Sequence, residues 1–330
     1  MNVGSYNPSR MKRLPAMAGP IGATVPFPRS RDRGFPWRLL WRAGICLVGA
    51  FFVCCAIGAY VGWTLTHPAR KPLDASPSGF NSRDVQFQSV VDHLVLSGWF
   101  LDASSDKTVI MVHGYRDNRL QGNVPGLDVA RGLVDHGYNF LTFDLRDAGR
   151  SDGSMTTIGV YEQRDVLGAI AFVRTLGVPG RHIALLGYSM GAATALLVAG
   201  QDAGVQAVVS DSAFADLYPY LQENLPVWSH LPAFPFTPLI LAFEPAITGV
   251  NPRLAGPVRA VPKIQAPVLF IHGLADTQVP YHNSQELLAA AKNAADQLWL
   301  VPDADHVKSF QTDTQGYWDH VLPFLASALK

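Results

Sequence analysis

The sequence predicts an α/β protein in which a mostly parallel eight-stranded sheet carries helices on both faces and a cap insertion, with one transmembrane helix before it. Three observations lead to this prediction. A stretch near the N-terminus is uncharged and long enough to cross a bilayer. Beyond about residue 83, short apolar runs alternate with helical segments, which is the pattern of a parallel sheet covered by helices. A segment rich in proline and aromatic residues, 212–262, interrupts this alternation.

The composition is that of a folded protein. Of the 330 residues, 48% are hydrophobic and 16% are charged, so the chain can bury a sizeable core. The formal net charge of zero offers no general attraction for nucleic acid, and no such partner is expected. The three cysteines, Cys46, Cys54 and Cys55, all lie in the apolar stretch. The rest of the chain therefore has no disulfide framework, cysteine zinc site or cysteine nucleophile.

Residues 43–65 are predicted to span a membrane. As a helix they reach roughly 34 Å, against a hydrocarbon core of about 30 Å. Trp37 and Trp41 precede the stretch, and Tyr60 and Trp63 lie at its far end, as aromatic residues do at the two membrane surfaces. A buried core helix and a cleaved signal peptide are the alternatives, but the apolar part of both is usually shorter. A retained anchor is therefore expected.

The charges on either side of this span predict its orientation. Residues 1–42 contain eight basic side chains and one acid, whereas Arg70, Lys71 and Arg83 are the only basic residues close behind the span. Because an excess of positive charge stays cytoplasmic, we expect a single-pass protein of the cell membrane, with its N-terminus in the cytoplasm and its globular domain outside. The predicted parts are a disordered basic tail over 1–42, the span over 43–65, a linker over 66–82 and a globular domain over 83–330.

Beyond residue 83 the sequence predicts eight strands, most of them separated by helices. The first two strands follow each other directly and form a pair, and the later ones alternate with helices as parallel strands do. The predicted strands are 85–91, 93–100, 108–112, 138–144, 182–186, 205–209, 267–271 and 298–301. The predicted helices are 124–136, 160–176, 192–199, 283–295 and 317–329.

The insertion at 212–262 is predicted to be a cap or lid over a site. It contains nine prolines and seven aromatic residues, and so long an insertion in a compact fold is usually functional. We expect it to select apolar groups of a substrate, with Trp228 and Phe236 shaping the preference. The alternative is that the aromatic rings pack onto the sheet or against the membrane surface.

The pattern Gly-x-Ser-x-Gly occurs twice, at 149–153 and at 187–191. A serine nucleophile in this pattern needs a strand that runs into it and a helix that starts directly after it, so that its hydroxyl projects from a tight turn. The second occurrence has both, whereas the first lies in a polar loop. Ser189 is therefore the predicted nucleophile, and Ser151 is not.

Two backbone amides are predicted to hold the oxyanion that forms when a serine attacks a carbonyl. The amide of Met190 lies at the start of the helix after Ser189, and the amide of Tyr115 lies in the loop after the third strand. His113 in the same loop could act as a base, but a histidine at this place more often orders the loop.

A serine hydroxyl needs a base, and the base needs a carboxylate that orients it. Asp276 and His306 follow two successive strands, and they come after Ser189 in the order serine, acid, histidine. We therefore predict Asp276 as the acid and His306 as the base. Asp211 also follows a strand and remains an alternative acid. The other candidates are weaker: His282 and His320 on helices, and Asp303 and Asp305, which could tune His306.

These motifs resemble the α/β-hydrolase superfamily over residues 83–330. Within it they are similar to membrane-anchored bacterial serine hydrolases described as esterases or as relatives of the prolyl oligopeptidase group. One departure is Arg146-Asp147-Ala148-Gly149, where relatives usually have Arg-Gly-His-Gly, and this loop supports the site rather than performing chemistry. The motifs that carry the resemblance are His113–Asn118, Phe143–Arg146, Gly149–Gly153, Gly187–Gly191, His272–Asp276 and His306.

The resemblance implies a serine hydrolase that cleaves a carboxylic ester through an acyl-enzyme. A peptidase or a thioesterase with the same three residues is the alternative within this class, and a non-catalytic surface binding module is the alternative of another class. No cofactor or metal is expected, because no cluster of His, Asp or Glu has ligand spacing. The expected partners are a small ester or acyl substrate and the membrane around 43–65.

Overall fold

The computed structural model describes residues 1, 37–177 and 182–330, which form two compact units divided between Leu47 and Val48. Most of the predicted tail lies outside the described residues. Helix α1 extends from Trp37 to Thr66, so residues 37–42, which the sequence placed in the tail, are helical. The stretch Trp37–Arg42 contains neither glycine nor proline, and nothing in it interrupts the helix.

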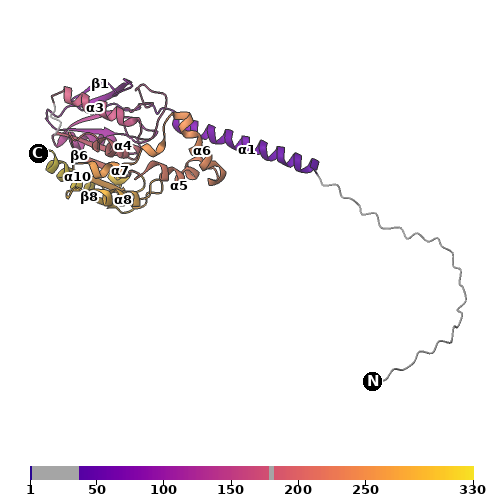
Figure 1. Cartoon of the computed structure of the whole chain (residues 1–330). Helices are drawn as coiled ribbons and strands as arrows, with labels where there is room; N and C mark the ends of the chain where they lie inside the picture. Colours follow the sequence, from indigo (N-terminus) through magenta and orange to yellow (C-terminus); the bar gives the residue numbers. More distant parts are fainter. Residues whose placement is uncertain (2–36, 178–181) are drawn as a thin grey trace, which may run out of the picture. The chain divides into compact units, whose positions relative to one another are not determined.

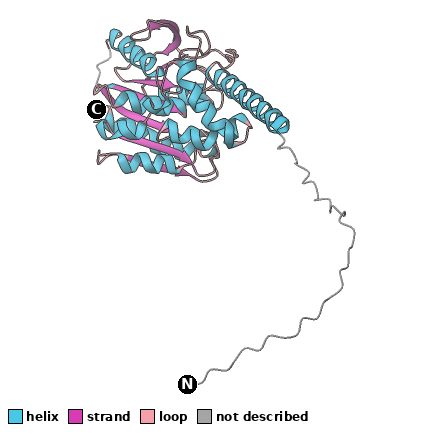
Figure 2. Ribbon diagram, turned by 45° about the vertical axis from the view of Figure 1, so that its right-hand side comes forward, coloured by secondary structure: helices cyan, strands magenta, loops and turns pink. Residues whose placement is uncertain are grey.

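The predicted fold class is confirmed: the chain forms one eight-stranded, mostly parallel sheet between layers of helices (Figure 2). The strand order is β1-β2-β4-β3-β5-β6-β7-β8, in which β2 pairs antiparallel with β1 and β4 and all other neighbours are parallel. The strands are β1 Ser82–Gln88, β2 Val95–Leu101, β3 Thr108–Val112, β4 Asn139–Phe143, β5 Ile183–Tyr188, β6 Val205–Asp211, β7 Val268–Gly273 and β8 Gln297–Val301.

Helices cover both faces of the sheet because successive side chains of its buried strands point to opposite faces. In β3, Ile110 packs into one core with α3, α4 and α8, whereas Met111 packs into a second core with α2 and α10. These helices are α2 Gly126–Asp135, α3 Glu162–Thr175, α4 Met190–Ala199, α8 His282–Ala290 and α10 Thr314–Ala328, and the short α9 Ser309–Thr312 precedes the last.

The insertion at 212–262 folds into helices that the sequence analysis did not predict. Helices α5 and α6 are bent by 119° to each other, and both contain proline within the helix. The elements are α5 Leu217–Ser229, α6 Ala233–Thr248, the 3₁₀ turns η2 Pro252–Leu254 and η3 Val261–Lys263, and α7 Pro257–Ala260 between them.

The end of α1 packs against α6 (Figure 1). A Cβ atom added at Gly58 would lie 3.2 Å from Cβ of Leu239, and one added at Gly62 would lie 3.0 Å from Cδ1 of Ile247. The two glycines stand one turn apart, so they open one side of α1 to close approach by another helix. The last turn of α1 also accepts a hydrogen bond, from the Tyr115 hydroxyl to the carbonyl of Leu65.

The segment predicted as a linker, 66–82, lies along the globular domain. The Arg70 guanidinium donates to the carbonyls of Ser151 and Gly153, at 2.6 Å each. The Thr156 amide donates to the carbonyl of Thr66 at 2.8 Å. Hydrogen bonds therefore hold the chain to the domain from the last residue of α1 onward.

Candidate active site

Ser189 stands at a tight turn between β5 and α4. Its backbone angles are φ 54° and ψ −117°, a conformation that costs a non-glycine residue free energy and persists where its surroundings enforce it. Side chains at Gly187 and Gly191 would not fit: a Cβ atom would lie 2.5 Å from Cα of Ala192 in the first case and 2.1 Å from the carbonyl oxygen of Val112 in the second. The two glycines thus let strand and helix pass closely, and the serine side chain projects from the turn.

The structure brings the three predicted side chains together in one chain of hydrogen bonds. Nε2 of His306 lies 2.9 Å from Oγ of Ser189, and Nδ1 of His306 lies 2.7 Å from Oδ2 of Asp276. Asp276 follows β7 and His306 follows β8, so both reach the edge of the sheet at which β5 ends. Because Asp276 accepts the proton on Nδ1, Nε2 is free to accept the serine proton.

Asp276 is held as a carboxylate in a buried place. Burial by itself would raise the pKa of Asp276, but hydrogen bonds from His272, from His306 and from the Val279 amide outweigh it and hold that pKa well below its ordinary range. Oδ1 accepts from the amides of Gln278 and Val279 at 2.9 and 2.8 Å, which fixes the plane of the carboxylate.

His272 is a positioning residue that the sequence analysis missed. Its Nε2 lies 2.7 Å from the carbonyl of Val279 and 3.3 Å from Oδ2 of Asp276, and its Nδ1 lies 2.6 Å from Oγ of Ser284. A carbonyl only accepts, so Nε2 carries the proton and donates toward both oxygens. His272 stands four residues before Asp276, at the end of the same strand, and this spacing is the signal that could have found it.

The two amides predicted to hold the oxyanion are those of Met190, which follows Ser189 in the chain, and of Tyr115, which follows Gly114. A Cβ atom added at Gly114 would lie 3.6 Å from Cβ of Ser189, so the loop after β3 passes directly beside the serine. The Gln121 side chain accepts from the Gly114 amide at 2.7 Å and holds this loop. Neither the Met190 nor the Tyr115 amide donates a hydrogen bond to another residue that the structure describes, which leaves both available to an oxyanion.

Ser189 and His306 line a cleft with a volume of about 380 Å³. Val227 and Trp228 of α5 form one side of it, and the Trp228 ring lies 5.5 Å from the Tyr115 ring, centroid to centroid. Two cations, Lys71 and Arg116, line the cleft, and no carboxylate is among its described lining residues. Phe236, which was expected to shape the substrate preference together with Trp228, does not line the cleft and packs against a buried cluster of α5 and α6.

Ser151, from the other glycine-serine motif, lies apart from this cleft and is 1% exposed. Its hydroxyl donates to the carbonyl of Asp144 at 2.6 Å and accepts from the Ser97 amide at 2.9 Å. The first bond closes the loop after β4 on itself, and the second ties that loop to β2. The hydroxyl of Ser151 therefore stabilises this loop and is not exposed to the cleft.

The other candidate acids and bases make contacts of their own. Asp211 accepts from the hydroxyls of Ser212 and Ser309, and burial raises its pKa to about 6. His113 lies 2.8 Å from the carbonyl of Gly114 and accepts from the Leu145 amide, while burial lowers its pKa, so it orders two loops as a neutral ring. The remaining candidates lie outside the cleft lining: His282 begins α8, His320 stacks on Trp299, and Asp303 and Asp305 are exposed.

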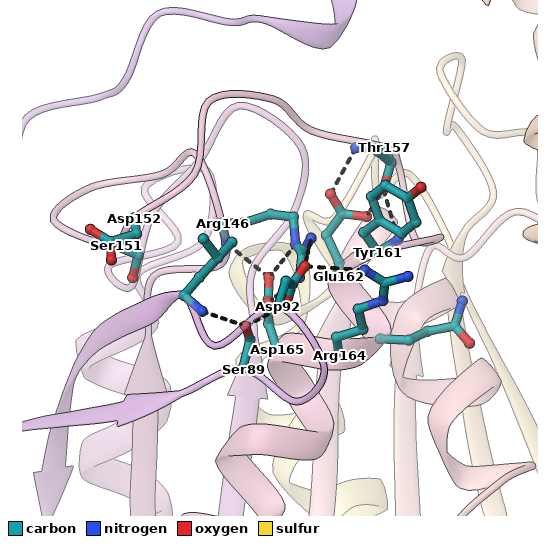
Figure 3. A network of polar contacts seen from close by, with 12 residues as sticks. Ser89, Asp92, Arg146, Ser151, Asp152, Thr157, Tyr161, Glu162, Arg164 and Asp165 are labelled. Carbon is teal, nitrogen blue, oxygen red and sulfur yellow. Dashed lines mark hydrogen bonds and ion pairs between the residues drawn. The ribbon is translucent and has the colours of Figure 1, made fainter. Parts of the chain in front are cut away.

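The loop 146–149, whose sequence differs from the Arg-Gly-His-Gly of relatives, is anchored by a network of ion pairs (Figure 3). Arg146 donates to Asp165 at 2.7 Å and to Asp92 at 2.8 Å, and so joins the loop to α3 and to the turn between β1 and β2. At the start of α3, Glu162 accepts from the amide and the hydroxyl of Thr157, both at 2.8 Å. These residues hold the loop in place at this edge of the sheet, and none of them forms a hydrogen bond with Ser189. Among the described residues, no group of three or more His, Cys, Asp or Glu could hold a metal ion.

Known proteins share this architecture. A family model of the α/β hydrolase fold matches residues 107–243. The uncharacterised protein YqkD of Bacillus subtilis is 31% identical over 220 residues, which cover 66% of this chain and 70% of that protein. YfhR of Escherichia coli K12, also uncharacterised, is 29% identical over 265 residues, which cover 77% of this chain and 84% of that protein.

Among solved structures, the esterase Pf2001 of Pyrococcus furiosus is similar with a TM-score of 0.69 and 28% identity, over 81% of this chain and 99% of that one. The match to the fold family supports an enzyme with hydrolase activity. Sheet order, the turn at Ser189 and these similarities agree, and the chain belongs to the α/β-hydrolase superfamily.

Proposed function

We propose that the protein is a membrane-anchored serine hydrolase that cleaves carboxylic esters through an acyl-enzyme on Ser189. The observation that carries the proposal is the hydrogen-bonded chain from Ser189 through His306 to Asp276, which opens into a cleft beside two unpaired amides. The similarity to an esterase of Pyrococcus furiosus over most of the chain supports an ester as the substrate.

In this reaction His306 acts first as a base and then as an acid. Oγ of Ser189 bonds to the ester carbonyl carbon while its proton passes to Nε2 of His306, and the carbonyl oxygen becomes an anion beside the amides of Met190 and Tyr115. The bond to the alcohol then breaks as His306 returns the proton to the leaving oxygen. Water repeats the sequence and releases the acid. Asp276 stabilises the imidazolium in both halves.

The proposal is tested with the full chain in detergent. We expect p-nitrophenyl butyrate to give an initial burst of p-nitrophenol close to one equivalent per enzyme, because the acyl-enzyme accumulates when deacylation is slower than acylation. Mass spectrometry of the quenched enzyme should find the butyryl group on the peptide that contains Ser189. The matched thioester and an aminoacyl amide are run in parallel. Faster turnover of either than of the ester would move the activity to that class, and no reaction with any of them or with a fluorophosphonate would favour a binding module.

The proposed topology places the N-terminus in the cytoplasm and residues 66–330 outside it. One helix among the described residues, α1, is by itself long and apolar enough to cross a membrane, and eight of the nine charges before residue 43 are basic. We expect protease added to spheroplasts to digest the globular domain, because that domain would face the medium. A cytoplasmic marker protein serves as the control. A protected domain with a cleaved N-terminus would reverse the orientation.

A further inference from the structure

Helix α6 has an exposed face without charge. Its one ionisable residue is Glu244, which is partly buried, and a Cβ atom added at Gly62 of α1 would lie 3.8 Å from its carboxylate. A helix on the surface of a soluble domain normally shows charged and polar residues to the solvent. The exposed residues of α6 are Ala233, Phe234, Pro238, Ala242, Pro245 and Ala246, and Phe234 is 83% exposed.

This helix packs on a part of α1 that lies within the predicted span. Gly58 stands seven residues before Leu65, the last residue of the span, and therefore roughly 10 Å inside its end. Leu239 touches α1 at Gly58, so this part of α6 stands at the same depth. On α1 the neighbouring residues Tyr60 and Trp63 are 68% and 53% exposed, so both packed helices present exposed aromatic side chains.

Helix α5 connects this surface to the cleft. On one side Leu225 packs with Ile240 and Leu241 of α6 and with the end of α1. Two residues further along α5, Val227 lines the cleft together with Ser189 and is 59% exposed. Helix α5 thus packs on α6 through the buried Leu225 and presents the exposed apolar side chain of Val227 to the cleft.

We infer that α6 is immersed in the membrane leaflet next to Thr66, and that the substrate is an acyl ester of a bilayer lipid, taken from that leaflet past Val227. The occupant of the apolar face is lipid because the helix on which α6 packs is itself the membrane span. The inference rests on the proposed ester hydrolysis and adds the substrate class. Ser189 bonds to the acyl carbonyl carbon of the lipid, the bond to the lipid alcohol breaks with the proton from His306, and water then releases the fatty acid.

The immersion is tested without any turnover. The full chain is reconstituted in phosphatidylcholine and phosphatidylglycerol nanodiscs that contain a lipid with a diazirine in its acyl chain, then irradiated and mapped by mass spectrometry. We expect lipid adducts on α1 and also on the peptide 232–247, with α3 as the unlabelled control. Adducts confined to α1 would overturn the inference. A crosslink between the α6 helices of two copies, without lipid adducts there, would assign the face to a second copy and overturn it as well.

The substrate class is tested with a charge on the exposed face of α6. Ala242→Asp should lower hydrolysis of a fluorogenic diacyl lipid in vesicles about tenfold, because a carboxylate resists transfer into lipid. The rate on soluble p-nitrophenyl acetate should change less than about twofold, since residue 242 does not line the cleft. Ala171→Asp on the exposed side of α3 is the matched control and should change neither rate, and Ala242→Leu should keep the lipid activity.

The results separate this inference from the proposed function. Equal loss on both substrates, or no loss on the lipid, in Ala242→Asp would overturn the lipid substrate. If Ala242→Asp fails to fold, which labelling of Ser189 by a fluorophosphonate reports, Phe234→Ser replaces it with the same expected split between the two substrates. A wild-type enzyme that cleaves soluble esters but leaves vesicle lipids intact would remove the lipid and keep the esterase.

Discussion

Ser189→Ala is expected to lower kcat by roughly 10⁴-fold or more, while the protein keeps its fold. The alanine removes the only atom that bonds to the substrate carbonyl, and what remains is the stabilisation by the two amides and the binding of the substrate. Hydrolysis of p-nitrophenyl butyrate by the purified full chain measures the loss. Circular dichroism and thermal unfolding check that the fold is intact.

Ser151→Ala is the matched control, since it changes the other serine of the same motif. It deletes the hydroxyl that joins the carbonyl of Asp144 to the Ser97 amide, so stability should fall by about 1–3 kcal/mol. Turnover of the folded variant should stay within a few-fold of wild type. A fluorophosphonate that labels Ser151 and spares Ser189 would show that the nucleophile is assigned to the wrong motif.

Asp276→Asn is expected to lower kcat on the order of 10³–10⁴-fold. The asparagine can donate to His306 through its NH₂ group, which favours the tautomer that has its proton on Nε2 and cannot accept from Ser189. The variant also loses the carboxylate that stabilises the imidazolium. Single-turnover acylation with p-nitrophenyl butyrate is the measurement, because it reports the proton transfer directly.

Asp211→Asn is the comparison for this variant. Asp211 contacts two serine hydroxyls rather than His306, and its loss should change kcat by less than about tenfold. A reversed order, with Asp211→Asn the more damaging, would move the acid to the end of β6. His272→Phe should lie between the two, because Asp276 would keep its backbone hydrogen bonds but lose one that fixes its plane.

The sheet could be predicted closely because its central strands are continuous apolar runs. Thr108–Val112 has the predicted bounds, and the other strands begin and end within a few residues of theirs. The order of Ser189, Asp276 and His306 at successive strand ends was also readable, since parallel strands bring those ends to one edge. The four-residue spacing to Asp276 could have indicated His272, but its role depends on the contact between its buried side chain and that carboxylate, which strand order does not reveal.

The cap could not be predicted because its helices contradict local propensity. Pro226, Pro238 and Pro245 lie inside α5 and α6, although proline removes a helical hydrogen bond and usually ends a helix. Tertiary packing outweighs this cost, and that packing includes α1, which lies far away in the sequence. The bend between α5 and α6 explains Phe236, whose place against a buried cluster of both helices no local pattern could indicate.

The packing of Gly58 and Gly62 on α6 also bears on how the protein is made. Helix α1 leaves the ribosome and can enter the bilayer long before α6 has been synthesised. Contacts between segments so distant in sequence form late, because closing the long intervening loop costs entropy first. In the membrane-anchored protein that we propose, the insertion at 212–262 therefore completes its fold on a helix that is already in the bilayer. The proposed anchor then serves as the template on which this part of the domain assembles.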